Sequence, residues 1–140
     1  MKINKKIKDS GLETVLYIVI GFVIAYAFNM GLGLALSTET PVVSVFSESM
    51  VPTLQKGDLI VVKGSESFEV GDIIVFDVSQ YGYPIIHRII DIDSGEISTK
   101  GDHNSVKDPW KIKEENIHGK AILKVPILGW VKIVFTDIIF

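Results

Sequence analysis

Two serines, Ser47 and Ser49, lie one residue apart just before the segment Met50-Val51-Pro52. In an extended backbone, residues two apart point to the same side, so one hydroxyl could attack a carbonyl while the other donates a hydrogen bond. Pro52 has no N–H and a fixed φ angle, which ends strand pairing and makes the local turn rigid. Serines near a proline also commonly form turns or helix caps. The segment therefore predicts either a catalytic nucleophile or an ordinary turn.

A serine nucleophile needs a general base, because a free hydroxyl is unreactive near neutral pH. Of the three histidines, His87 lies in an apolar, strand-like run where Val or Ile would be expected. A histidine there is either a core residue with a polar partner or a base. Asp102 and Asp108 follow in a loop rich in turn formers, and an aspartate from this loop could fix the imidazole tautomer and stabilise the imidazolium. The alternative is a hairpin turn in which an aspartate bonds the backbone.

The element that precedes these residues is an apolar run at 12–36, with a single charge near its start. About 20 apolar helical residues span a hydrocarbon core of about 30 Å, so the run predicts a transmembrane helix. A buried core helix would show a polar stripe, and a cleaved signal peptide has a shorter apolar region. Four lysines precede the run, which predicts that residues 1–11 are cytoplasmic and that the chain beyond the span is extracytoplasmic.

Beyond the apolar run, short segments rich in Val and Ile alternate with Gly, Asp and Pro. These segments predict strands at 42–46, 58–63, 72–78, 84–93, 96–100 and 118–125. Continuous Val/Ile runs favour strands that are buried on both faces. The predicted fold class is mainly β: a small, partly closed antiparallel β domain at 37–125 with an N-terminal transmembrane helix. The apolar segment 126–140 is too short for a comfortable span and is expected to form an interfacial helix.

Composition excludes several kinds of site. The chain has no cysteine, which excludes disulfides, a thiolate nucleophile and cysteine-ligated zinc. Its net charge is −3, and the part beyond the apolar run keeps 10 basic and 15 acidic residues, a net charge of −5. A negative domain argues against a nucleic-acid-binding surface.

Several motifs follow one another in a fixed order. Ser-x-Ser-Met-x-Pro-Thr-Leu comes after the predicted anchor and is followed by Gly-Asp-Leu-Ile-Val, Gly-Asp-Ile-Ile-x-Phe, His-Arg-Ile and Lys-Gly-Asp-x-Asn-x-x-x-Asp. Over about residues 42–124 this order resembles type I signal peptidase, and more narrowly its archaeal and endoplasmic-reticulum branch, in which His replaces the catalytic Lys of most bacterial enzymes. The resemblance implies a serine endopeptidase without metal or cofactor. Its substrates would be signal peptides, cleaved after small residues at the first and third positions before the bond.

Residue by residue, the resemblance makes Ser49 the nucleophile and His87 the general base. Asp108 matches the aspartate that assists the histidine, and Asp102 matches an earlier aspartate that is also important in this branch. Which aspartate contacts His87 stays open. Ser47 matches the residue whose hydroxyl joins the Ser49 backbone N–H in the oxyanion hole. The apolar positions that match substrate pockets, and that would otherwise be interpreted as core residues, are Val43, Val45, Met50, Leu54, Ile85 and Ile86.

One position departs from the family, because Glu48 stands where relatives often have Gly; we expect its carboxylate to point to solvent. The partners implied are signal peptides of secretory preproteins and membrane lipid, and no nucleic acid. Accessory subunits or the translocon stay open as further partners. The location implied is the cell membrane, or the endoplasmic-reticulum membrane in a eukaryote.

Two other interpretations are weaker. Self-cleaving repressor proteases share the family's fold, but they use Lys as base and carry a DNA-binding domain, and neither feature is present. A non-catalytic β module tethered to a membrane would have no need for Ser49, His87 and the two aspartates together.

Overall fold

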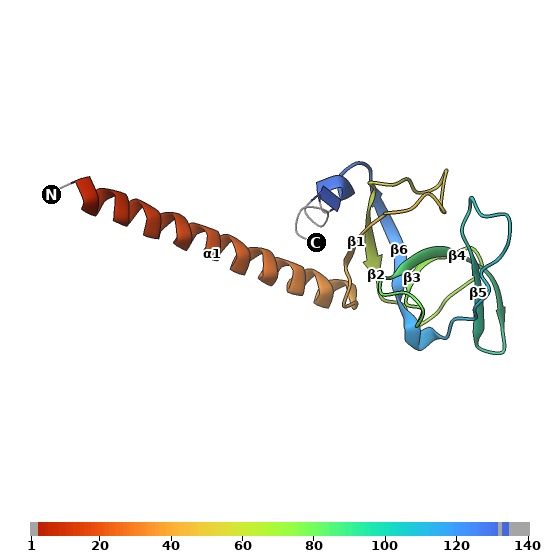
Figure 1. The fold of residues 1–140 in the computed structure, drawn as a ribbon. Helices are drawn as coiled ribbons and strands as arrows, with labels where there is room; N and C mark the ends of the chain where they lie inside the picture. The colour runs from red at the N-terminus through yellow and green to blue at the C-terminus, as the bar shows by residue number, and fades with distance from the viewer. Residues whose placement is uncertain (1–2, 132, 135–140) are drawn as a thin grey trace. The chain divides into compact units, whose positions relative to one another are not determined.

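A computed structural model describes residues 3–131, 133 and 134 (Figure 1). The chain divides into two compact units, Met1–Ala35 and Leu36–Phe140. Helix α1 (Ile3–Leu36) contains one stretch, Gly11–Leu36, that is long and apolar enough to cross a membrane. This stretch matches the predicted span at 12–36. The helix starts earlier, within the lysine-containing segment, because lysine is a good helix former and does not end a helix.

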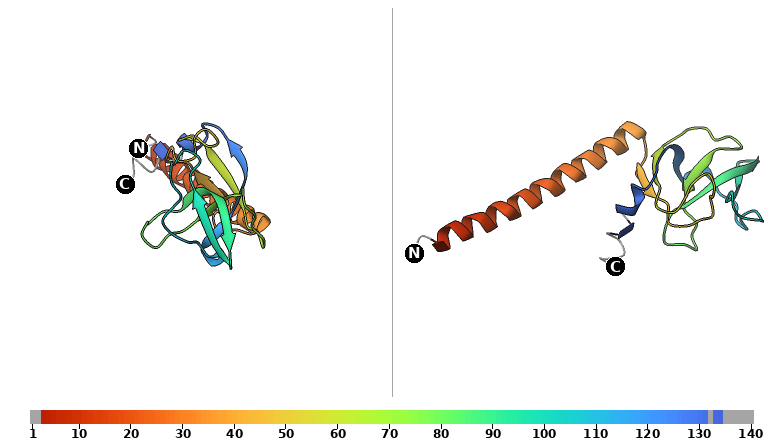
Figure 2. Two further views of the ribbon diagram at one scale, coloured as in Figure 1. Left: turned by 90° about the vertical axis from the view of Figure 1, so that its right-hand side faces the viewer. Right: turned by 90° about the horizontal axis from the view of Figure 1, so that it is seen from above.

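The second unit is built on one antiparallel sheet of six strands in the order β1-β2-β6-β3-β4-β5 (Figures 1 and 2). Its elements are β1 (Val42–Ser44), β2 (Leu59–Lys63), β3 (Ile73–Phe76), β4 (Ile85–Asp93), β5 (Glu96–Lys100), η1 (Glu114–Asn116) and β6 (Ile117–Val125). The predicted fold class, mainly β and antiparallel, is confirmed. The sheet is open rather than closed, because β1 and β5 form its two edges among the strands described.

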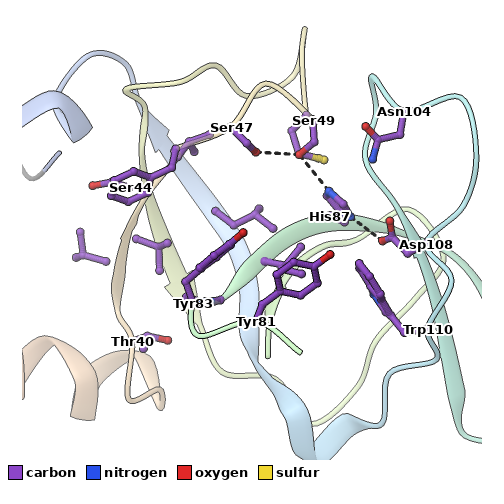
Figure 3. Close-up of a pocket in the computed structure, with 18 residues that line it drawn as sticks. Thr40, Ser44, Ser47, Ser49, Tyr81, Tyr83, His87, Asn104, Asp108 and Trp110 are labelled. Carbon is purple, nitrogen blue, oxygen red and sulfur yellow. Dashed lines mark hydrogen bonds and ion pairs between the residues drawn. The ribbon is translucent and has the colours of Figure 1, made fainter. Parts of the chain in front are cut away.

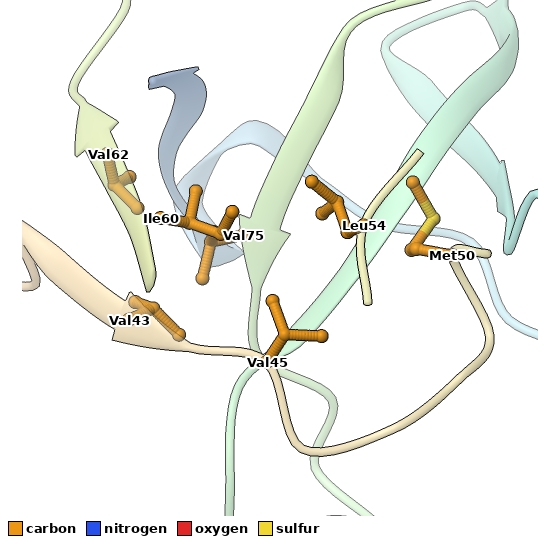
Figure 4. Packing of buried hydrophobic residues seen from close by; sticks show 7 residues of the cluster. All are labelled: Val43, Val45, Met50, Leu54, Ile60, Val62 and Val75. Atoms are coloured by element: carbon orange, nitrogen blue, oxygen red, sulfur yellow. The ribbon is translucent and has the colours of Figure 1, made fainter. Parts of the chain in front are cut away.

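The domain has two apolar clusters. The first lies beside the serine loop and contains Val43, Val45, Met50, Leu54, Ile60, Val62 and Val75 (Figure 4). The second lies between β3, β4 and β5 and contains Ile74, Phe76, Val78, Ile89, Ile97 and Ile112. Strand β3 sends alternate residues into both clusters and is buried on both faces, as its Ile/Val run predicts. Strand β2 is less symmetric, because Val61 between the buried Ile60 and Val62 is only half-buried.

The first cluster fixes the serine loop through Met50, which is only 1% exposed. Burial of a side chain of this size stabilises the fold by about 1.5–3 kcal/mol. The backbone N–H of Leu54 also donates to the carbonyl of Met50 at 2.9 Å, closing a turn directly after the serines. Met50, the residue after Ser49, is therefore buried in the core, and this burial keeps Ser49 close to the sheet.

The described part of the C-terminal segment is helical at residues 129–131, 133 and 134. It packs on the turn before β2, where Gly57 has a φ angle of 93° and a Cβ would lie 1.9 Å from Nε1 of Trp130. The segment 126–140 thus includes helical residues in its described part, and residues 132 and 135–140 lie outside the described residues. Its placement at a membrane interface stays a prediction.

Candidate active site

Ser47 and Ser49 leave β1 on one loop, and their hydroxyls meet. Ser49 Oγ lies 3.1 Å from Ser47 Oγ and 3.0 Å from Nε2 of His87 (Figure 3). The predicted pair of hydroxyls on one side of the chain is therefore present. No backbone or side-chain acceptor bonds the Ser49 N–H within the described part of the chain. Ser49 is half-buried and Ser47 is exposed, so a carbonyl group can reach both.

His87 projects from β4 and is buried, with an exposure of 7%. Its Nδ1 lies 2.6 Å from Oδ2 of Asp108, and that oxygen also accepts a 2.7 Å hydrogen bond from the Thr99 hydroxyl. The Asp108 backbone N–H donates to the Thr99 carbonyl at 2.9 Å. Asp108 is therefore held on β5, the strand that neighbours β4, and it faces the imidazole from the side opposite to Ser49.

Asp102 lies elsewhere. The Arg88 guanidinium donates to it twice, from Nε to Oδ1 at 2.8 Å and from Nη2 to Oδ2 at 2.7 Å, and the Thr53 hydroxyl donates to Oδ2. The hydrogen bonds from Arg88 lower the pKa of the Asp102 carboxyl below its usual value; burial opposes this and the Thr53 hydroxyl adds to it. The aspartate in contact with His87 is thus Asp108, and Asp102 joins β4 to the turn after the nucleophile loop.

An open cavity of about 680 Å³ runs beside the Ser49–His87 pair (Figure 3). Five of the six predicted substrate-binding residues line it: Val43, Val45, Met50, Ile85 and Ile86. Leu54 does not; its side chain packs in the first apolar cluster at 4% exposure. The carboxylate-bearing residue Glu48 is exposed, as expected. No three His, Cys, Asp or Glu side chains in the described ranges lie close enough together to hold a metal ion.

Sequence reasoning missed several cavity residues, among them Tyr81, Tyr83, Asn104 and Trp110. The aromatic rings form one wall, since the ring centroids of Tyr81 and Trp110 lie 5.6 Å apart and those of Tyr81 and Tyr83 lie 5.7 Å apart. A signal for the two tyrosines exists in the Tyr-Gly-Tyr-Pro turn that leads into the histidine strand. For Trp110 the only signal is its place two residues after Asp108.

Comparison with known proteins gives the family. The Peptidase S24-like family model matches residues 23–131, most of the chain. The chain belongs to the Peptidase S24-like family. It is 35% identical over 133 residues to the signal peptidase complex catalytic subunit sec11 of Dictyostelium discoideum, covering 84% of this chain and 74% of the relative. It is 33% identical over 138 residues to the signal peptidase complex catalytic subunit SEC11 of Zygosaccharomyces rouxii, covering 87% of this chain and 83% of the relative.

These relatives confirm the resemblance to type I signal peptidase and place the chain in the endoplasmic-reticulum branch. A family member of this kind is a serine protease, which accords with a serine hydroxyl in contact with a histidine. The roles assigned to the individual residues rest on geometry and chemistry.

Proposed function

We propose that this chain is a membrane-anchored serine endopeptidase that removes signal peptides from exported preproteins. The observation that carries the proposal is the line of contacts from Ser49 Oγ to His87 Nε2 and from His87 Nδ1 to Asp108, at the edge of an open apolar cavity. The names of the SEC11 relatives, which are catalytic subunits of a signal peptidase complex, support the same reaction here.

The first half of the reaction forms an ester. Asp108 keeps the proton of the neutral imidazole on Nδ1, so the lone pair of Nε2 accepts the Ser49 hydroxyl proton. Ser49 Oγ attacks the scissile carbonyl carbon as its proton passes to Nε2, and the negative charge of Asp108 stabilises the imidazolium. The oxyanion accepts hydrogen bonds from the Ser49 backbone N–H and from the Ser47 hydroxyl. When the C–N bond breaks, Nε2 returns the proton to the leaving amine.

The second half hydrolyses that ester. A water molecule replaces the departed amine, His87 takes one of its protons, and the resulting hydroxide equivalent attacks the acyl carbon. The bond between that carbon and Ser49 Oγ breaks, and the proton on Nε2 passes to Ser49. The signal peptide leaves with a free carboxylate, and serine and histidine return to their starting states.

The substrate would bind as an extended strand. Strand β1 is an edge of the sheet. Strand β5 pairs with β4 only from Arg88 onward, so in the described register residues 85–87 pair with β3 on one side and with no strand on the other. A peptide beside these segments gains backbone hydrogen bonds whatever its sequence. Residues two apart in that peptide face the same wall. The aromatic wall of Tyr81, Tyr83 and Trp110 limits the room there, which favours small side chains at the first and third positions before the bond.

The membrane arrangement follows from the chain. Four lysines before the apolar span favour a cytoplasmic N-terminus, and the catalytic domain would then lie on the opposite side of the membrane. About a dozen residues separate the end of the span from Ser49, so the site acts near the bilayer, where membrane-inserted signal peptides are found. Accessory subunits are proposed as partners, because the SEC11 relatives are subunits of a complex.

The test is cleavage of a preprotein with an Ala-x-Ala site by the full chain in liposomes. Wild type is compared with Ser49→Ala, His87→Ala and His87→Lys. His103→Ala is the matched control, because His103 is an exposed histidine. We expect loss of cleavage by both catalytic alanine variants with unchanged thermal unfolding, and full activity of the control. Cleavage by His87→Ala would overturn the base assignment. No cleavage by wild type, alone or in membranes that supply accessory subunits, would overturn the proposed reaction.

A further inference from the structure

Asn104 is a polar cavity residue that the proposed reaction does not use. It lines the cavity together with Ser49, His87 and Asp108, and it is half-buried. Its side-chain amide has no hydrogen-bond partner among the described residues, whereas its backbone N–H donates to the Gly101 carbonyl at 3.0 Å. An amide that faces a cavity without a partner can bind a ligand there, because it carries both a donor and an acceptor.

The loop that carries Asn104 is fastened to the nucleophile. The backbone N–H of His103 donates to the carbonyl of Ser49 at 2.8 Å. A Cβ on Gly101 would lie 2.6 Å from that same carbonyl oxygen and 2.7 Å from Nδ2 of Asn104, so this glycine allows both groups to approach. The Asn104 side chain therefore packs on Gly101, beside backbone that is hydrogen-bonded to Ser49.

The cavity has two ends on either side of the catalytic pair. The aromatic residue Tyr83 and Thr40 lie toward one end, and Asn104 lies beyond the Ser49–His87 pair toward the other (Figure 3). In the proposed reaction the apolar end, beside β1 and the start of β4, holds the residues before the scissile bond. Because the scissile carbon must lie at Ser49 Oγ, the chain that follows the bond is directed toward the Asn104 end.

We propose that Asn104 binds the backbone of the first residues after the scissile bond. Its amide would donate to a peptide carbonyl and accept from a peptide N–H of the segment that becomes the new N-terminus. Backbone recognition suits this side of the bond, since a peptide unit offers the same groups whatever the sequence of the exported protein. This role rests on the proposed function and makes Asn104 a substrate-binding residue on the leaving-group side.

Two substrates with the same residues before the bond test the inference. The first continues for several residues after the bond, and the second ends in a 4-nitroanilide, which has no peptide unit to bind Asn104. We expect Asn104→Ala and Asn104→Ser to lower kcat/KM for the first substrate about ten- to hundredfold, the effect of two lost hydrogen bonds, and to leave the second within about twofold. Ser105→Ala, in the exposed neighbouring residue, should change neither.

The possible failures are distinguishable. An equal loss on both substrates would mean that Asn104 only supports the Ser49 loop, and it would overturn the inference while leaving the proposed function intact. No loss on the longer substrate would also overturn the inference alone. If wild type cleaved neither substrate, and Ser49→Ala behaved as wild type, the proposed function would fall and this inference with it.

Discussion

Replacing Asp108 with asparagine removes one negative charge and keeps the size of the side chain. In the structure, Oδ2 of Asp108 faces Nδ1 of His87 at 2.6 Å and the Thr99 hydroxyl at 2.7 Å. In Asp108→Asn an amide nitrogen can take this position, since the Thr99 hydroxyl can accept as well as donate. The imidazole would then carry its proton on Nε2, which faces Ser49 and could no longer accept the serine proton.

The expected loss is large because both effects act on the same step. In the serine protease template, the corresponding substitution lowers kcat by about 10⁴. Asp108 is 8% exposed, so water cannot replace the lost charge, and we expect kcat to fall by about 10³–10⁴. That factor corresponds to about 4–5.5 kcal/mol of transition-state stabilisation, at about 1.36 kcal/mol per factor of ten.

The assay is single-turnover cleavage of a preprotein in liposomes, with thermal unfolding measured on the same samples. The matched control is Asp102→Asn, which leaves the contact between His87 and Asp108 intact and should cost at most about tenfold in kcat. An Asp108→Asn enzyme that is folded and keeps a tenth or more of the wild-type rate would refute the reasoning. So would a larger loss of kcat in Asp102→Asn at unchanged stability.

Three further predictions concern the oxyanion hole, the pH dependence of stability and the backbone. Ser47→Ala removes one of two proposed oxyanion donors and should lower kcat about 10²-fold in the same cleavage assay; a change below threefold would exclude this role. The hydrogen bonds from Arg88 lower the pKa of Asp102, so this pair stabilises the fold above about pH 4. This stabilisation is lost as the pH falls below that value. When Tm is measured from about pH 6 down to about pH 3, it should therefore fall less steeply in Asp102→Asn than in wild type. Gly119 has a φ angle of 150°, and a Cβ there would lie 2.3 Å from a backbone carbonyl of β2. Gly119→Ala should therefore lower the free energy of unfolding by about 2 kcal/mol. Gly82→Ala is the control, since Gly82 has open space around it, and it should leave Tm unchanged.

Much of the fold was predictable because its signals are local. Strand β5 was predicted at 96–100 and is found at Glu96–Lys100, since the turn Asp93-Ser94-Gly95 and the alternation after it are encoded within a few residues. Strand β1 was predicted two residues too long, because Val45 bonds the backbone of Gly57 and Asp58, which precede β2. The predicted span at 12–36 corresponds to the apolar part of α1, because the lysine-containing residues before it carry no hydrophobic signal.

The assignment of the two aspartates could not be made from the sequence. Both lie in one loop, and His87 and Arg88 are adjacent on one strand, so several pairings satisfy the spacing. The choice depends on the pairing of β4 with β5, which has an irregular register between Ile89 and Asp91, and on the bond from Asp108 to Thr99. The aromatic wall was missed for a similar reason, since Trp110 meets Tyr81 only after the loop has folded back.

Asp102 and Asp108 carry their negative charges in different environments. Asp102 receives two charge-assisted bonds from Arg88, so its negative charge is already compensated by a cation. Besides the imidazole, the Asp108 carboxylate accepts only from a neutral donor among the described residues, the Thr99 hydroxyl. Its charge is therefore left to stabilise an imidazolium on His87. In the proposed mechanism Arg88 thus compensates the charge of Asp102, the aspartate that does not contact the base. The hydrogen bond from Thr53 to Asp102 also holds the turn at Thr53 close to β4, the strand that carries His87.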